Sequence, residues 1–290
     1  MATESALANA DKAEMKVGYK SVIDLGREAK VGFPHNLFDY PTKILPQVMG
    51  EFIDRLSSPH DVILDPFAGG GTVAVECALR QRRSISIDIN PHAVEITRKK
   101  LEMLRSGNLF GDIDIEQQKV MIGDARSLDI PSESIDAVIT DIPYADMIRY
   151  SNIPEDLSTI EDYDVFLAEL YKALSEIHRV LKTGKYCAIF VADYRIGRSR
   201  LIIPIHADVI YMMQDLGFTL FDLYIWRYYR SGSFRPFGAK PYQAMNAHTY
   251  ILVFHKPDKP VEIIKNRQIR YRERLIEKLN RNENRHGYKL

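Results

Sequence analysis

Short apolar runs alternate with amphipathic helical segments along most of the chain, and no other feature of the sequence restricts the fold as strongly. Strands that alternate with helices are typical of βαβ units and of a parallel sheet. The pattern predicts strands near residues 61–65, 84–88, 119–122, 135–141, 185–192, 219–226 and 248–255. It predicts helices near residues 44–57, 72–82, 91–105, 162–182 and 205–216.

The last two predicted strands have no helix between them, so we expect the sheet to have an antiparallel end. The sequence therefore predicts an α/β fold of Rossmann-like type, with a seven-stranded, mostly parallel sheet and helices on both faces. We expect a single domain over residues 31–258, because the chain is long enough to bury one large core. Residues 1–30 are predicted to be an N-terminal tail, and the basic residues 259–290 a C-terminal helix or arm.

Composition excludes several classes of protein. Lys and Arg number 39 and Asp and Glu number 39, so a nucleic-acid partner would have to be held by a local basic patch. The two cysteines, Cys77 and Cys187, lie in separate apolar stretches, which argues against a zinc site and against a disulfide framework. No apolar run has the length of a membrane helix, and residues 1–15 lack the apolar core of a signal peptide. We therefore expect a cytoplasmic enzyme with no membrane partner and no metal.

A glycine-rich turn, Asp65-Pro66-Phe67-Ala68-Gly69-Gly70-Gly71-Thr72, follows the predicted strand 61–65. Glycines let a backbone approach a cofactor closely, so this turn predicts a cofactor site. The turn also leaves an alternative open, because Gly69-x-Gly71-x-x-Ala74 with Asp88 fits a relaxed dinucleotide fingerprint. On this feature alone, a nicotinamide-dependent oxidoreductase is an equal candidate.

A second motif, Asp141-Ile142-Pro143-Tyr144, closes the predicted strand 135–141, 72 residues after Gly69. Such a strand end offers a carboxylate, the Ile142 carbonyl and a flat ring to a planar group that bears an amine. A nucleobase is such a group, whereas an oxidoreductase has no use for this arrangement. Taken singly, Asp141 would be a turn residue and Tyr144 a core residue. Together with the glycine turn, they favour transfer of a group onto an exocyclic amine.

These motifs resemble those of the S-adenosylmethionine-dependent amino-methyltransferases of nucleic acids, which methylate adenine N6 or cytosine N4. Residues 65–72 are similar to the family's D-P-F-x-G-x-G-T, and residues 141–144 to its (D/N/S)-P-P-(Y/F/W). Residues 40–46 look like the family's cofactor-binding segment before the first strand. The resemblance covers residues 33–255, with a departure at Ile142, where the family has proline. Isoleucine keeps the carbonyl but changes the stiffness of the turn.

The resemblance implies a class I methyltransferase fold with S-adenosylmethionine as the cofactor. It implies that Asp65 lies near the methionine part and that Asp88 accepts the ribose hydroxyls. Asp124 would hold the adenine amine, although a lone acid at such a position is more often a helix cap. The cofactor-binding residues that the resemblance implies are Thr42, Lys43, Asp65, Phe67, Ala68, Gly69, Gly71, Thr72, Asp88, Ile89, Asp124 and Ala125.

The resemblance also implies that Asp141, Ile142, Pro143 and Tyr144 are the catalytic residues. The amine of adenine or cytosine is a poor nucleophile, because the ring draws in its lone pair. The Asp141 carboxylate and the Ile142 carbonyl would accept its two hydrogens, so that the lone pair faces the methyl sulfonium. Tyr144 would stack on a base that has left its duplex. In the family, Asp at this position is commoner among the adenine enzymes.

Basic and aromatic side chains interleave over residues 227–242, a composition that suits a single strand or a flipped nucleotide. A loop held together by its own aromatic rings is the alternative. Residues 195–200 add a second basic turn, and the predicted loop after residue 144 carries one more arginine. The nucleic-acid contacts that we expect are Arg149, Arg195, Arg198, Arg227, Arg230, Arg235 and Lys240.

The substrate that we expect is DNA. RNA is the first alternative, because the chain has little room for the target-recognition domain that sequence-specific DNA enzymes of this kind append. A protein amide or a small molecule is a more distant alternative, since glutamine amides meet similar sites. A binding module without catalysis would have no use for Asp141 together with Tyr144.

Overall fold

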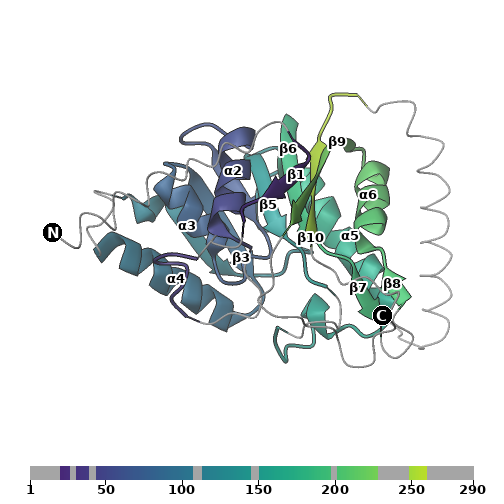
Figure 1. Cartoon of the computed structure of the whole chain (residues 1–290), viewed down its shortest axis with the longest axis horizontal. Coiled ribbons are helices and arrows are strands. Elements are labelled where there is room, and N and C mark those ends of the chain that lie inside the picture. Colours follow the sequence, from purple (N-terminus) through teal and green to yellow (C-terminus); the bar gives the residue numbers. More distant parts are fainter. Residues whose placement is uncertain are drawn as a thin grey trace.

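The computed structural model describes residues 20–26, 31–38, 44–106, 113–144, 150–196, 201–227 and 248–259, with the backbone alone at 195 and 196. Its centre is an eight-stranded sheet in the order β1-β9-β10-β6-β5-β2-β3-β4 (Figure 1). The strands of this sheet are β1 (Val22–Asp24), β2 (Val62–Asp65), β3 (Arg83–Asp88), β4 (Gln118–Ile122), β5 (Ile135–Asp141), β6 (Leu181–Val191), β9 (Thr219–Arg227) and β10 (His248–His255). The helices are α2 (Pro46–Leu56), α3 (Thr72–Leu79), α4 (Pro91–Ser106), α5 (Tyr163–Val180) and α6 (Ile205–Asp215).

Five neighbouring strands, β6, β5, β2, β3 and β4, run parallel, so their carboxyl ends meet at one edge of the sheet. β10 runs antiparallel to both β6 and β9, which brings the end of β9 to the same edge. The strands predicted between residues 61 and 255 and the helices predicted between residues 44 and 216 are all present, whereas the C-terminal helix or arm predicted over 259–290 lies, beyond residue 259, outside the described residues. The mostly parallel α/β sheet of Rossmann-like type is therefore confirmed.

The sheet has one strand more than predicted. β1 lies in the segment that we expected to be a tail, pairs in parallel with β9, and buries Ile23 at 2% exposure. A strand of three residues carries no usable periodicity, so its partner strand specifies it. β10 is the antiparallel strand and pairs with β9 near one end of the sheet, as predicted, with β1 added beyond β9. The predicted domain boundaries stay predictions, although β1 begins the sheet ahead of residue 31.

A short antiparallel hairpin, β7 (Tyr194–Ile196) with β8 (Leu201–Ile203), was not predicted and stands apart from the main sheet. It follows β6 at the carboxyl edge of the sheet and precedes α6. Two strands of this length give too few residues for an alternating pattern to be recognised.

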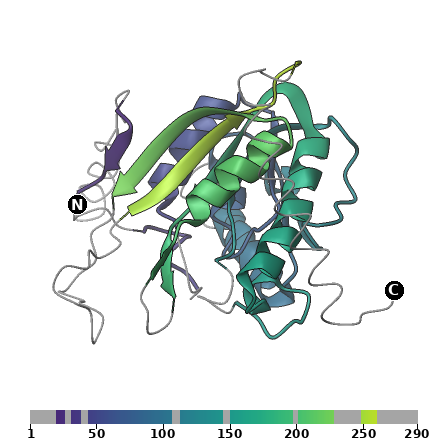
Figure 2. The ribbon, with the colours of Figure 1, turned by 90° about the vertical axis from the view of Figure 1, so that its right-hand side faces the viewer.

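Helices cover both faces of the sheet, as Figure 2 shows with α5 and α6 in front of the strands. α2 and α3 pack on one face against a core that includes Ile63, whereas α5 and α6 pack on the other against a core that includes Leu64. This division follows from the alternation of side chains along β2. α4 lies on the α3 side, where the two helices share a smaller apolar core.

α5 is fixed by its cap and by its apolar face. The Asp162 carboxylate accepts hydrogen bonds from two backbone N–H groups of the first turn, at 2.9 and 3.1 Å. Leu167, Leu170 and Leu174 recur at three- and four-residue steps, so they lie on one face of the helix, and all three are buried against the sheet. The helix ends at Val180, slightly before the predicted end, because Leu181 already begins β6.

Cys77 in α3 and Cys187 in β6 are buried and unpaired, as the sequence predicted. Burial raises the pKa of both thiols, so both stay protonated at neutral pH. Within the described ranges, we find no helix that combines the length and the apolarity needed to cross a bilayer.

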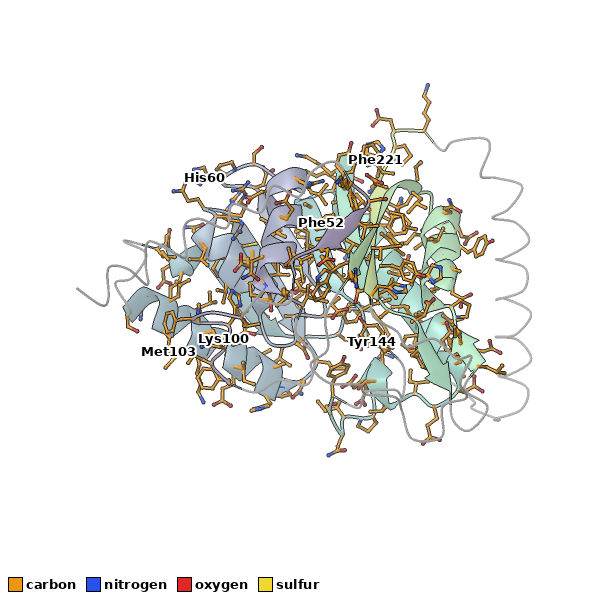
Figure 3. All side chains as sticks on the ribbon, in the orientation of Figure 1. Phe52, His60, Lys100, Met103, Tyr144 and Phe221 are labelled. Atoms are coloured by element: carbon orange, nitrogen blue, oxygen red, sulfur yellow. The ribbon has the colours of Figure 1, made fainter. Side chains whose placement is uncertain are left out.

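We predict that Phe52→Ala destabilises the protein by about 3–5 kcal/mol, because a large buried ring is removed from the core between α2 and the sheet. Phe52 is 1% exposed, and its ring centroid lies 5.7 Å from that of Phe190 and 5.2 Å from that of Tyr224. Urea unfolding measures the change. The control is Phe221→Ala, at a ring 62% exposed (Figure 3), which should cost below about 1.5 kcal/mol. Equal losses in the two variants would contradict the packing described here.

Candidate active site

A pocket of about 870 Å³, counting its open mouth, lies at the carboxyl ends of β2, β3, β4 and β5. Ligands of open α/β sheets bind at this edge. The structure brings most of the predicted catalytic and cofactor-binding residues together here. Those that line the pocket are Asp65, Phe67, Ala68, Gly69, Thr72, Asp88, Ile89, Asp124, Ala125, Asp141, Ile142 and Pro143. Thr42 and Lys43 lie outside the described residues.

Two side chains of α4 donate hydrogen bonds to backbone carbonyls of the glycine turn. The Thr97 hydroxyl donates to the Gly69 carbonyl at 3.3 Å, and the Lys100 ammonium donates to the Gly70 carbonyl at 2.6 Å. Gly71 has φ +77°, and a Cβ there would lie 2.4 Å from the Thr97 hydroxyl oxygen. Gly71 itself does not line the pocket, so its place in the motif reflects packing against α4.

Asp65, at the end of β2, is 3% exposed. Its Oδ1 accepts hydrogen bonds from the Thr140 hydroxyl at 2.7 Å and from the Phe67 amide at 3.2 Å. Burial raises the pKa of the Asp65 carboxyl to about 7, more than these two hydrogen bonds lower it. The nearby carboxylates of Asp88 and Asp141 add to the rise.

Asp88, at the end of β3, connects two turns. Its Oδ2 accepts from the Gly69 amide at 2.7 Å, and its Oδ1 accepts from the Asn90 amide at 2.8 Å. Burial raises the pKa of Asp88 to about 6, although both backbone donors lower it. Each carboxylate oxygen keeps a second lone pair, so Asp88 can still accept hydrogen bonds from a ligand.

Asp124, in the turn after β4, is paired with Arg126. The guanidinium donates from Nε to Oδ1 at 2.9 Å and from Nη2 to Oδ2 at 2.6 Å. Burial alone would raise the pKa of Asp124, but the hydrogen bonds and charge of Arg126 outweigh it and lower the pKa. Arg126 also donates to the Glu169 carboxylate at 2.6 Å and to the Glu155 carbonyl at 2.9 Å. Sequence reasoning did not single out this arginine, because Glu169 and Glu155, two of its three partners, lie far away along the chain.

Asp141 ends β5 and faces the pocket beside Ile142 and Pro143. The Tyr144 hydroxyl donates to its Oδ1 at 2.6 Å, whereas its Oδ2 has no hydrogen-bond partner in the described part of the chain. Burial raises the pKa of Asp141 to about 7, and the Tyr144 hydrogen bond opposes the rise. The carboxylate therefore has one oxygen held in place and one oxygen available to a substrate.

Tyr144 does not line the pocket in this structure. Its ring is 5% exposed and packs in the core on the α5 side of the sheet (Figure 3), where its hydroxyl supports Asp141. Stacking of Tyr144 on a base therefore stays a prediction. In this buried position the Tyr144 hydroxyl gives the Asp141 carboxylate a hydrogen-bond donor, and Asp141 has no other donor within the described residues.

Residues 150–157 form one wall of the pocket, with Tyr150, Glu155, Asp156 and Leu157 among its lining residues. The Asn90 side-chain amide donates to the Tyr150 carbonyl at 3.2 Å, which ties this wall to the turn after β3. The sequence predicted a loop over the site but did not single out these residues. In the sequence they form a pattern of two adjacent acids before an apolar residue. This pattern is common in ordinary turns, so it does not indicate a pocket wall.

The pocket carboxylates at the ends of β2, β3 and β5 lack a counter-charge within the described residues. Asp65, Asp88 and Asp141 make no ion pair within the described residues, and every donor to them is a neutral N–H or O–H group. Desolvated carboxylates without a cation are costly, which is the physical cause of their raised pKa values. A positively charged ligand would offset this cost. The same ranges hold no group of three His, Cys, Asp or Glu side chains suited to a metal ion.

Of the predicted nucleic-acid contacts, the structure describes the side chain of Arg227 alone. It lies at the end of β9, hence at the same edge of the sheet as Asp141, and its Nη1 is 3.4 Å from Oδ2 of Asp24. The backbone of Arg195 lies in β7. Arg149, Arg198, Arg230, Arg235 and Lys240 lie outside the described residues.

Residues 15–99 and 135–289 match a family model described as DNA methylase. The chain is also similar to the type II methyltransferase M.MjaII of Methanocaldococcus jannaschii, at 34% identity over 94 residues that cover 31% of this chain and 18% of that protein. It is 34% identical over 113 residues to a tRNA (guanine(10)-N2)-dimethyltransferase of Methanothermobacter thermautotrophicus, which covers 38% of this chain and 31% of that protein. The matched part is therefore less than a third of either relative.

Among solved structures, a SAM-dependent methyltransferase from Methanosarcina mazei resembles this chain with a TM-score of 0.50 and 15% sequence identity. The match covers 72% of this chain and 98% of that one. At this identity the likeness concerns the fold, and it agrees with the Rossmann-like methyltransferase architecture that the motifs implied.

We predict that the unliganded protein becomes less stable as pH rises from about 5.5 to about 8, a range that lies above the titration of the carboxyls whose pKa is lowered on folding. A carboxyl whose pKa is raised on folding contributes stability below its unfolded value, and the contribution is lost as pH passes the folded value. Thermal unfolding across this range measures the trend for wild type and for Asp141→Asn. The variant should show a smaller decline, because one of the raised pKa values is removed.

His178 makes the comparison with a variant necessary. Burial lowers the pKa of His178, so this group acts in the opposite direction in mildly acidic solution. The difference between wild type and Asp141→Asn cancels that contribution. A difference that stays constant with pH would contradict the raised pKa of Asp141.

Proposed function

This chain belongs to the DNA methylase family, and on that premise we propose that it methylates an exocyclic amino nitrogen in DNA, adenine N6 or cytosine N4, with S-adenosylmethionine. The observation that carries the proposal is the meeting of Asp141 and the glycine turn in one pocket, with one Asp141 oxygen available to an amine. The carboxylate at the end of β5 would have no purpose in a site that bound the cofactor alone.

The pocket fits the cofactor in charge and in shape. Asp65 and the glycine turn would receive the methionine part, whose ammonium and sulfonium groups match carboxylates that lack a counter-charge. Asp88 would accept the ribose hydroxyls, and Asp124 with the Ala125 amide would contact the adenine edge. Gly71, which packs against Thr97, would act by allowing the turn to approach α4 closely.

The cofactor supplies an electrophilic methyl group on a positively charged sulfur. Oδ2 of Asp141 would accept one hydrogen of the base amine, and the Ile142 carbonyl would accept the other. The amine nitrogen would then become pyramidal, with its lone pair free to form the N–C bond as the S–C bond breaks. The proton that the amine loses would pass to the Asp141 carboxylate and on to solvent. Alignment of the amine with the methyl group contributes about 7–11 kcal/mol over free reactants. Asp141 has to be ionised to accept the hydrogen, so we expect kcat/KM, which reports the pKa values of the free enzyme, to rise as pH passes about 7.

The acidity of the pocket bears on how a nucleic acid enters it. Carboxylates of Asp65, Asp88 and Asp141 repel phosphate groups, so a base would enter while its backbone stays outside. A base inside a duplex has to leave the stack to reach such a site. Arg227, at the same edge, is placed to meet the backbone outside the pocket.

RNA is the alternative substrate, favoured by the similarity to a tRNA (guanine(10)-N2)-dimethyltransferase. The family match supports DNA over RNA. Methylation of a protein amide or of a small molecule receives no support from these comparisons. A cytoplasmic setting is part of the proposal, and the two unpaired buried thiols, Cys77 and Cys187, are consistent with a reducing compartment.

We predict that Asp141→Ala lowers methyl transfer by at least about 100-fold, while cofactor affinity changes by no more than about tenfold. The variant removes the acceptor for the amine but leaves the turn and Asp88 in place. A methyl-transfer assay beside isothermal calorimetry measures both quantities. The control is Asp129→Ala, at an exposed acid outside the pocket, which should change neither. Loss of cofactor binding that equals the loss of activity would contradict the assigned role.

We predict that labelled methyl groups appear on adenine N6 or cytosine N4 of DNA. The protein is incubated with labelled cofactor and with DNA, RNA or protein from cells that lack the gene. Mass spectrometry of the released nucleosides and peptides identifies the modified group. Label confined to RNA would replace the proposal by its alternative, and label confined to protein would refute both.

A further inference from the structure

Two of the pocket carboxylates are joined through one buried hydroxyl. β2 and β5 pair in parallel, with Leu64 opposite Val138, so Asp65 and Asp141 end adjacent strands at the same edge. Thr140, the residue directly before Asp141, is fully buried and donates its hydroxyl to Asp65 Oδ1 at 2.7 Å. The strand end that faces the substrate is thus hydrogen-bonded to the strand end that starts the glycine turn.

The surroundings of this pair are neutral or negative. Asp88 on β3 and the protonated thiol of Cys77 on α3 face Asp65, and the Tyr144 hydroxyl faces Asp141. The nearest buried ammonium to the turn, Lys100, is directed at the Gly70 carbonyl. By contrast, Asp124 on the same pocket is paired with Arg126. Within the described residues, the Asp65 and Asp141 carboxylates therefore depend on a ligand for positive charge.

We propose that the Asp65–Thr140–Asp141 unit makes the pocket select the positively charged sulfonium cofactor over the neutral thioether that remains once the methyl group has left. The inference rests on the proposed function and adds a consequence for turnover. Cofactor and thioether product share their adenosine and amino-acid parts. They differ in one methyl group and in one positive charge.

The selection follows from Coulomb interactions in a desolvated site. The charge of the sulfonium group stabilises both carboxylates in their ionised form, so binding of the cofactor expels protons that the empty pocket holds near neutral pH. After transfer, that charge has left the sulfur, so the two carboxylates lose the sulfonium charge that stabilised their ionised form. They take up protons, and the thioether is held less tightly than the cofactor was.

The test is calorimetry on the full chain, from about pH 5.5 to about pH 8.5, in two buffers with different heats of ionisation. The ligands are S-adenosylmethionine, S-adenosylhomocysteine and sinefungin, which carries an ammonium group in place of the methyl sulfonium. We expect the two charged ligands to release protons near neutral pH and the thioether to release fewer. The preference for the cofactor over the thioether should rise about tenfold for each unit by which the charged ligand lowers a carboxyl pKa.

Two variants assign the effect to the unit. Asp141→Asn should reduce the preference for the cofactor over the thioether several-fold. Thr140→Val should move the pH at which this preference is half developed upward, because Asp65 loses a hydrogen bond that lowers its pKa. The matched control is Asp124→Asn, which removes a pocket acid already paired with Arg126 and should weaken both ligands equally. The wild-type pH series decides the question even if a variant fails to fold.

The results separate this inference from the proposed function. Equal affinity for cofactor and thioether at every pH, with methyl transfer intact, would overturn the charge selection and leave the function standing. A preference that Asp124→Asn abolishes and Asp141→Asn leaves unchanged would overturn the assignment to this unit. Failure of the cofactor to bind at all would refute the proposed function and this inference with it.

Discussion

The hydrogen bond from the Gly69 amide to the Asp88 carboxylate is the contact on which the shape of the pocket depends, because it joins the turn after β2 to the end of β3. The turn can present that amide because Thr97 and Lys100 of α4 bind the carbonyls on its other side. A helix that never meets the ligand therefore determines where the backbone donors point. Such packing explains why the glycine motif is needed even at a residue that does not reach the pocket.

The sequence predicted the parts of the structure that have local signals. Strands and helices of the main sheet follow from periodicity, and the acids at strand ends follow from motifs, since a parallel sheet brings carboxyl ends together. Contacts set by distant partners were not predictable. β1 is specified by β9, and Arg126 is held by Glu169 of α5 and the Glu155 carbonyl as well as by its neighbour Asp124. The burial of the Tyr144 ring likewise depends on distant core residues, while its hydroxyl donates to the nearby Asp141.

Charge divides the carboxyl edge of the sheet into two regions. The pocket carries acids that lack cations within the described residues, whereas Arg227 stands at the same edge three strands away from β5 in the order β9-β10-β6-β5. Phosphate groups would be repelled by the acids inside the pocket, and the guanidinium of Arg227 that could meet them at the rim already lies beside Asp24. On the proposed function, a neutral base would enter the pocket while its phosphates stay outside.

The antiparallel strand has a consequence for where the chain can change in length. Arg227 at the end of β9 pairs directly with His248 at the start of β10, so the chain leaves the sheet and re-enters it at adjacent positions. Any insertion between them is anchored at both ends by the same ladder, and the entropy of closing it grows slowly with its length. A change of length there would leave the register of β9 with β10 unchanged and would not move the strand ends that line the pocket.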